Sequence, residues 1–283
     1  MRVWIDGEVV DGEQARVPVL DHGFLYGDGI FEGMRSFGGR VFRIDDHLDR
    51  LGYGARALDL ELPGGKPGLR RIVEETLRDD GRPDAYIRLI VSRGVGPLGV
   101  DASSCGAPRV TCIVDGLSIF SEEARLRGIA MATVAERRPM GDALDPRIKS
   151  LNYLNNVMAR MQARRQGADE GLVLNREGAV AEASVANVFV VKDGLLRTPP
   201  TSDGSLDGMT RRTVLELSGE LGMEARVERL GRIDLLAADE VFLTGTGAGI
   251  VRVREFDRQL IGAGEPGPVT TALADAYARR VRE

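Results

Sequence analysis

The sequence has few of the residues on which metal and disulfide chemistry depend. Its 283 residues include two cysteines, Cys105 and Cys112, and two histidines, His22 and His47. These four residues lack the spacing of a metal site, so we expect no metal. Two isolated cysteines fit a reduced, cytoplasmic setting. Any chemistry should therefore depend on lysine, carboxylates, tyrosine, arginine or an organic cofactor.

The sequence also lacks the features of a membrane or nucleic-acid partner. Residues 1–10 contain no signal-like apolar run, and no apolar run in the chain approaches the roughly 20 residues of a membrane span. The net charge is −5, and basic residues are interspersed with acidic ones. Nothing therefore favours nucleic acid or an anionic surface, and we expect small-molecule partners.

The remaining composition and the order of elements predict two α/β (α+β) domains. Hydrophobic residues make up 43% of the chain and charged residues 29%, which is enough to build packed cores. Short strands and helices predict a small N-terminal domain over 1–115 and a larger C-terminal domain over 125–283. Residues 116–124 are predicted to be a linker. Such an arrangement favours a site in the cleft between the domains.

Lys149 is the lysine with the most unusual predicted position. It follows Pro146 and is expected directly before a helix over 151–166, with Tyr153 one turn away on the same face. A cation is disfavoured at a helix N-terminus, and a perturbed position is a hint of function. The alternative is a solvated lysine at a helix start, which is the more common environment for lysine.

Glu182 is a carboxylate among small and apolar residues, just before a predicted strand over 187–191. It is either a strand-edge glutamate that faces water or a carboxylate aimed at a cationic partner in a cleft.

Three further features could bind an anion. Gly208–Thr210 opens a predicted helix over 209–221, whose N-terminus could bind a phosphate. The segment 244–249 is rich in glycine and could form a nest of N–H donors. Arg50 could add a bidentate phosphate contact or be an ordinary surface arginine. A lysine, a carboxylate and a phosphate cup are what pyridoxal phosphate requires of a protein.

The sequence resembles the fold-type IV, class IV pyridoxal-phosphate aminotransferases, and among them most closely the branched-chain amino acid aminotransferases. The resemblance covers nearly the whole chain. Its most specific segments are 26–35, 47–51, 86–88, 148–156, 182–189, 206–211 and 245–248.

This resemblance implies a role for each matching residue. Lys149 resembles the Schiff-base lysine and proton shuttle, Glu182 the partner of the pyridine nitrogen, and Tyr153 the partner of the cofactor's phenolic oxygen. The implied phosphate ligands are Arg50, Met209, Thr210 and Thr246. The backbone of Gly247 and Ala248 would bind the substrate carboxylate. The implied pocket walls are Phe31, Tyr86, Arg88 and, from a neighbouring subunit, Tyr26, Leu98 and Val100.

The implied reaction is transamination of L-valine, L-leucine or L-isoleucine with 2-oxoglutarate, which Arg88 would help to bind, in a cytoplasmic homodimer or larger homo-oligomer. A D-amino acid aminotransferase is an alternative with the same fold, although 97–100 lacks the Arg-x-His pair of that branch. An aminodeoxychorismate lyase and a catalytically idle cofactor-binding protein are further alternatives. Ala186, Gly249 and Arg252 depart from the family pattern, and these departures bear on the substrate rather than on the cofactor.

Overall fold

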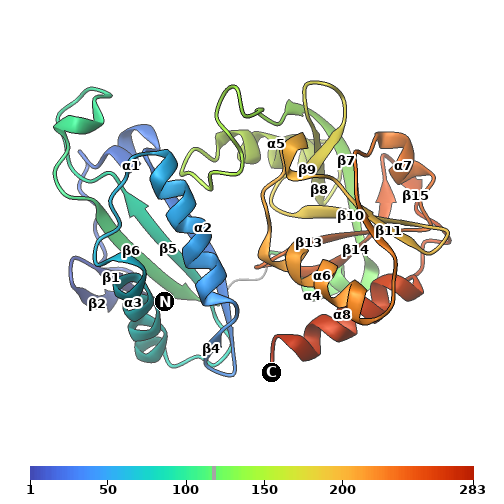
Figure 1. The fold of residues 1–283 in the computed structure, drawn as a ribbon, viewed down its shortest axis with the longest axis horizontal. Helices are drawn as coiled ribbons and strands as arrows, with labels where there is room; N and C mark the ends of the chain where they lie inside the picture. Colours follow the sequence, from blue (N-terminus) through green and yellow to red (C-terminus); the bar gives the residue numbers. More distant parts are fainter. Residues whose placement is uncertain (117–118) are drawn as a thin grey trace. The chain divides into compact units, whose positions relative to one another are not determined.

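The computed structural model describes residues 1–116 and 119–283, which divide into two compact units (Figure 1). The first unit contains residues 1–117 together with Ile148–Asn152, and the second contains residues 118–147 and 153–283. The short segment Ile148–Asn152 joins the first unit because its backbone bonds to β3 (Gly29–Phe37). The Phe31 N–H donates to the Lys149 carbonyl, and the Leu151 N–H donates to the Gly29 carbonyl, each at 2.9 Å.

This division differs from the predicted one in two places. The predicted domain over 125–283 was wrong for residues 148–152, which pair with the first unit. The predicted linker over 116–124 was wrong at its end, because α4 (Glu122–Arg127) begins inside it. Ser121 starts this helix by accepting the Ala124 N–H, a side-chain cap that the sequence prediction missed. Residues 117 and 118 of that linker lie outside the described part of the chain.

An antiparallel sheet of order β2-β1-β6-β5-β3-β4 organises the first unit. Its other strands are β1 (Arg2–Ile5), β2 (Glu8–Asp11), β4 (Arg40–Val41), β5 (Tyr86–Ser92) and β6 (Arg109–Asp115). Its helices are α1 (His22–Tyr26), α2 (Ile44–Ala57), α3 (Gly65–Asp80) and the 3₁₀ helix η1 (Ala102–Ser104). β3 pairs with β4 across a tight turn at Gly38-Gly39, where both glycines have positive φ.

Side chains alternate between the two faces of the sheet along β3 and β5. One face packs in the core of the unit, and the other carries the predicted pocket residues. Ile30 and Ile87 belong to the core that also contains residues of α2 and α3. Phe31, one residue on from Ile30, must therefore point to the opposite face of the sheet, and so must the cross-strand partners Gly33 and Arg88. This register places the predicted pocket residues of β3 and β5 on the face away from the helical core.

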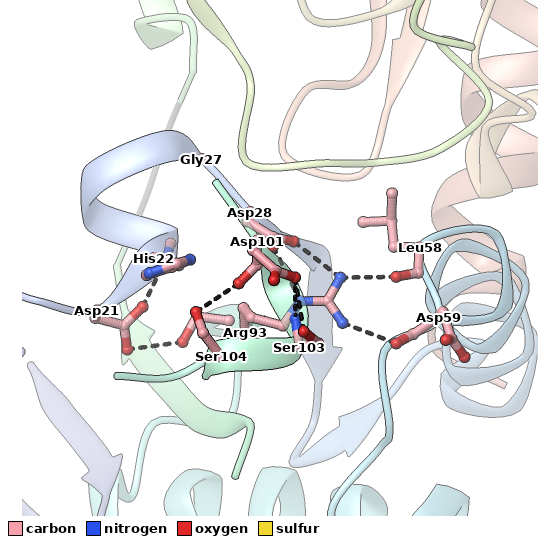
Figure 2. A network of polar contacts seen from close by, with 12 residues as sticks. Asp21, His22, Gly27, Asp28, Leu58, Asp59, Arg93, Asp101, Ser103 and Ser104 are labelled. Carbon is pink, nitrogen blue, oxygen red and sulfur yellow. Dashed lines mark hydrogen bonds and ion pairs between the residues drawn. The ribbon is translucent and has the colours of Figure 1, made fainter. Parts of the chain in front are cut away.

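The loop between β5 and β6 is held at its start by Arg93 (Figure 2). The Arg93 guanidinium donates to Asp28 at 2.9 and 3.2 Å and to the carbonyls of Leu58 and Asp59 at 2.7 Å. Further along the loop, Asp101 caps η1 by accepting from Ser103. The segment that carries Leu98 and Val100 therefore lies between two anchored points.

The second unit is built on a nine-stranded sheet of order β12-β11-β10-β13-β14-β7-β8-β9, with β15 beside β14. Its strands are β7 (Ile129–Arg137), β8 (Glu170–Leu174), β9 (Val180–Ala183), β10 (Asn187–Lys192), β11 (Leu195–Thr198), β12 (Ala225–Val227), β13 (Glu240–Gly245), β14 (Gly249–Phe256) and β15 (Gln259–Leu260). Besides α4, its helices are α5 (Leu154–Arg165), η2 (Thr201–Asp203), α6 (Met209–Glu220), α7 (Arg232–Leu236) and α8 (Pro268–Arg280).

Helix α5 lies against β7 and β8 through small residues. Ala159 and Ala163 are fully buried in this contact, and a Cβ on Gly171 would lie 3.0 Å from the Ala159 carbonyl oxygen. The close approach fixes β8, and β8 pairs with β9 so that Val173 lies opposite Glu182. The helix packing thus determines where the Glu182 carboxylate stands.

Candidate active site

In the first unit, Phe31 brings Lys149 and Arg88 together. The Lys149 Nζ lies 4.4 Å from the centroid of the Phe31 ring, and the Arg88 guanidinium carbon lies 4.6 Å from the same centroid. Both distances are typical of cation–π contacts. The Arg88 Nη2 also donates to the Tyr86 hydroxyl at 3.0 Å. Four residues that the sequence singled out therefore form one cluster.

The expected helical relation between Lys149 and Tyr153 was wrong. Helix α5 begins at Leu154 and Tyr153 is its N-cap, so Lys149 lies in the extended segment that bonds to β3. The helix dipole therefore does not act on Lys149 as the sequence suggested. Pairing with β3 competes with helix formation over residues 151–153, and this competition is invisible in a local pattern.

Arg50 is buried on α2 and is bound by a carboxylate that the sequence prediction missed. Its Nε and Nη2 each donate to Glu32 at 2.7 Å, and the His47 Nδ1 lies 2.7 Å from the same carboxylate. Although burial alone would raise it, the charge of Arg50 and the contact with His47 lower the pKa of Glu32 to about 2. Burial lowers the pKa of His47, so we assign a neutral imidazole that donates to Glu32. The surface-arginine alternative for Arg50 is wrong.

Helix α2 starts after Arg43, its N-cap, with φ 52, and the Arg43 Nε donates to Asp46 at 2.6 Å. Asp45 lies in the first turn and pairs with Lys66 and Arg70.

Tyr26 and the two apolar loop residues expected to serve a neighbouring subunit lie together. The Tyr26 hydroxyl accepts the N–H of Gly99, which stands between Leu98 and Val100, at 3.0 Å. The loop is held again at Pro97, whose carbonyl lies 3.0 Å from the His22 Nε2. Leu98 and Val100 are 76% and 84% exposed, so this ordered loop presents apolar side chains outward.

In the second unit, Glu182 is buried within β9, and the alternative in which it faces water is wrong. The Arg138 Nη2 lies 3.0 Å from its Oε1. Its other oxygen, Oε2, accepts from the Asn187 Nδ2 and from the Leu206 N–H, each at 3.1 Å. Arg138 thus places a positive charge against this buried carboxylate, and two amide donors hold its other oxygen.

The predicted helix start at Gly208 is confirmed. Gly208 is the N-cap of α6, and no side chain caps the helix. Met209 and Thr210 form its first turn, where N–H groups and the helix dipole favour an anion.

The glycine-rich segment 244–249 forms the hairpin between β13 and β14. Gly245 pairs with Gly249, and the Ala248 N–H donates to the Gly245 carbonyl at 3.1 Å. Thr246 and Gly247 lie at its tip. Gly249 has φ +66, in the left-handed region that favours glycine.

The other two departures also have structural roles. The Arg252 guanidinium donates to the carbonyls of Gly264 at 2.8 Å and Arg127 at 2.5 Å, so it joins the end of α4 to β14. Ala186 is buried in the core of the second unit, where a carboxylate would lack water.

Within residues 1–116 and 119–283, no group of three or more histidine, cysteine or acidic side chains could hold a metal ion. Over the same residues, no helix has the length and apolar character required to cross a membrane.

Comparison with known proteins identifies the family. The family model described as amino-transferase class IV matches residues 29–256. A protein of Methanocaldococcus jannaschii is 44% identical over 277 residues, covering 98% of this chain and 95% of its own. The crystal structure of a branched-chain aminotransferase from Thermoproteus uzoniensis with norvaline is 36% identical, with a TM-score of 0.92, and covers 100% of this chain and 95% of that one.

A branched-chain amino acid aminotransferase from Thermobaculum terrenum in its PLP form has a TM-score of 0.89 at 29% identity, covering 100% of this chain and 94% of that one. The fold is therefore that of class IV aminotransferase structures, as the sequence predicted. The chain belongs to the class IV aminotransferase family.

The Glu32 carboxylate should make stability depend on pH in a defined direction. Its folded pKa of about 2 lies below the ordinary 4.5, so its contribution is complete above pH 4.5 and is lost as pH falls through 2. Glu32→Gln leaves the Arg50 charge buried and should cost roughly 3–5 kcal/mol at pH 7. Urea unfolding at several pH values measures the difference, which should shrink below pH 4.5.

The control is Glu220→Gln, which removes an exposed partner of Arg280 and should cost under about 1 kcal/mol at every pH. A Glu32→Gln deficit of constant size from pH 7 to pH 3 would contradict the assignment.

Proposed function

We propose that the protein is a pyridoxal-phosphate aminotransferase that moves the amino group of L-branched-chain amino acids to 2-oxoglutarate. The observation that carries the proposal is the cluster of Lys149, Phe31 and Arg88, which joins an amine to an apolar ring and a carboxylate-binding cation. Relatives named as branched-chain aminotransferases match nearly the full length of the chain. The amino acid and the 2-oxo acid are its small-molecule partners.

The donor groups fit this cofactor. Glu182 is a buried carboxylate fixed by charged and amide donors, which suits a protonated pyridine nitrogen. At the N-terminus of α6, Gly208 has no side chain that could cover the N–H groups of Met209 and Thr210, which suits a phosphate. We propose Arg50 and Thr246 as the further phosphate ligands and Tyr153 as the partner of the phenolic oxygen.

When bound, the cofactor supplies an electron sink for the charge that develops at the substrate Cα. The residues of the chain do the rest. Lys149 would hold the cofactor through its Nζ, and once the substrate amine has replaced it, the free Nζ would act as the base that takes the proton from the substrate Cα. Glu182 holds the proton on the ring nitrogen by charge. The backbone at Gly247 and Ala248 is proposed to orient the substrate carboxylate.

The substrate proposal depends on the open face of β3 and β5. Phe31 and Tyr86 offer apolar surface, and Leu98 and Val100 of a second subunit would add to it. Burial of an aliphatic side chain there contributes about 0.8 kcal/mol per CH₂. The second carboxylate of 2-oxoglutarate would bind Arg88, whose buried Nε has no hydrogen-bond partner among the described residues.

A cytoplasmic location is part of the same proposal. Both cysteines are free thiols, as in a reducing compartment. Cys112 is buried, and burial raises its pKa to about 12, so it stays a thiol.

Self-association is proposed from an apolar stripe on α5. Leu154, Val157, Met158 and Met161 have the spacing of one helix face and are 47% to 69% exposed. A stripe of this kind on a soluble protein marks an interaction surface. A second copy of the chain is the proposed partner, because the resemblance assigns Tyr26, Leu98 and Val100 to a neighbouring subunit's pocket.

Replacement of the proposed cofactor lysine tests the function directly. Lys149→Ala should abolish the visible absorbance of bound cofactor and lower turnover of leucine with 2-oxoglutarate by about 10³-fold or more. Spectra of the purified enzyme and a coupled assay measure both. Lys192→Ala, which changes an exposed partner of Asp239, is the control and should match wild type. Normal absorbance and turnover in Lys149→Ala would reject the proposal.

Arg88→Leu separates the two substrates. The variant should raise the KM for 2-oxoglutarate by about 10- to 100-fold, because a charged hydrogen bond to the second carboxylate is lost. The half-reaction with leucine, followed by the change in cofactor absorbance, should stay within about threefold of wild type. Arg226→Leu, at an exposed partner of Glu224, controls for loss of a charge.

Faster reaction of the wild type with D-alanine than with any branched-chain L-donor would favour the D-specific alternative.

Met158→Glu tests the α5 stripe. A carboxylate at the centre of an apolar interface should convert the assembly to monomer at micromolar concentration, since an unpaired charge is costly to bury. Sedimentation velocity measures the change. Ile233→Glu is the matched control, because Ile233 is an exposed apolar residue of α7 outside the stripe. An unchanged sedimentation coefficient for Met158→Glu would place the subunit contact elsewhere.

A further inference from the structure

Asn187 connects two parts of the second unit that the proposed function uses separately. Its side-chain Nδ2 donates to the Glu182 Oε2 at 3.1 Å and to the Leu206 carbonyl at 2.8 Å. The Leu206 N–H donates to the same Glu182 oxygen at 3.1 Å. The backbone of Leu206 is thus held on both sides, because its carbonyl accepts from Asn187 and its N–H donates to Glu182.

The other end of the Asn187 amide lies against the start of α6. A Cβ on Gly208 would lie 2.1 Å from the Asn187 Oδ1, far inside contact distance. Gly208 has φ −72 and ψ 137, which any residue can adopt. Glycine is therefore required there for space and not for conformation. The amide oxygen of Asn187 therefore limits how closely the N-terminus of α6 approaches β10.

Asn187 is itself held firmly. It is 5% exposed and begins β10, where it pairs with Thr244 of β13. One buried side chain on a central strand thus touches the carboxylate on one side and the helix start on the other.

We propose that Asn187 is a positioning residue that fixes the spacing between Glu182 and the N-terminus of α6. This inference rests on the proposed function, in which those two groups hold the ring nitrogen and the phosphate of one cofactor. A rigid ligand gains full affinity from both ends only when the spacing of their partners matches it. Asn187 therefore couples the two ends without touching the reacting atoms.

The test compares pyridoxal phosphate with pyridoxal, which lacks the phosphate. Each is titrated into the 283-residue chain freed of cofactor. The Kd for pyridoxal divided by the Kd for pyridoxal phosphate measures how much the phosphate contributes to binding. Asn187→Ala should lower this ratio by about tenfold, because the phosphate site moves out of register. A merely structural role would weaken both ligands by the same factor, and that result would overturn the inference.

Two further variants sharpen the test. Gly208→Ala adds a Cβ that would clash with the Asn187 oxygen, and this variant alone should lower the ratio about tenfold. If Asn187→Ala fails to fold, the result for Gly208→Ala still tests the inference. In the Asn187→Ala background the same replacement should change the ratio less than about twofold, since the obstructing oxygen is gone. Equal effects of Gly208→Ala in both backgrounds would overturn the inference.

The control is Asn175→Ala. Asn175 is a fully buried asparagine of the same unit that donates to the Asp203 carbonyl and accepts from Glu177 and Ala179. Its loss should leave the ratio unchanged. A wild-type chain that binds pyridoxal as tightly as pyridoxal phosphate would reject the proposed phosphate site itself. A normal wild-type ratio that survives Asn187→Ala and Gly208→Ala rejects only the role of Asn187.

Discussion

Two backbone hydrogen bonds hold Lys149, the proposed cofactor lysine, against β3. The amides of Phe31 and Leu151 donate to the carbonyls of Lys149 and Gly29, so that a five-residue segment from the middle of the chain extends the edge of β3. Backbone pairing fixes direction as well as position, because successive side chains alternate between faces. Lys149 is therefore set beside Phe31, and the register of β3 with β5 then sets Arg88 beside the same ring.

Each unit contains one buried carboxylate among the predicted site residues and their neighbours, and each carboxylate depends on its set of partners. Glu32 is enclosed by Arg50 and His47, and Glu182 by Arg138, Asn187 and the Leu206 amide. A buried charge without partners is strongly destabilising, so each carboxylate constrains the side chains around it. In the proposed function, Glu32 orients the phosphate ligand Arg50, and the partners of Glu182 fix its carboxylate as the partner of a ring nitrogen.

Local patterns in the sequence predicted the ends of some elements better than the contacts between distant segments. The start of α6 at Gly208 follows from capping preferences and was confirmed. The predicted helix start at 151 was wrong, because β3, more than a hundred residues away, binds the backbone of Lys149 and Leu151. Glu32, Arg138 and Asn187 were missed because each matters only through contacts between distant segments. A glutamate between Phe31 and Gly33 in an apolar strand was the one available signal.

The Phe31 ring lies between the proposed cofactor lysine and the proposed carboxylate-binding arginine. Lys149 and Arg88 lie within 4.6 Å of its centroid, and they are not interchangeable, since an arginine can bind a carboxylate through two N–H groups while a lysine is a compact point charge. The ring favours both through its negative face and offers apolar surface at its edge. In the proposed reaction, one pocket must accept an aliphatic and a dicarboxylate substrate in turn. Under that proposal, an aliphatic side chain would contact the edge of Phe31, and the second carboxylate of the longer substrate would reach Arg88. A single aromatic side chain between Lys149 and Arg88 would then serve both substrates.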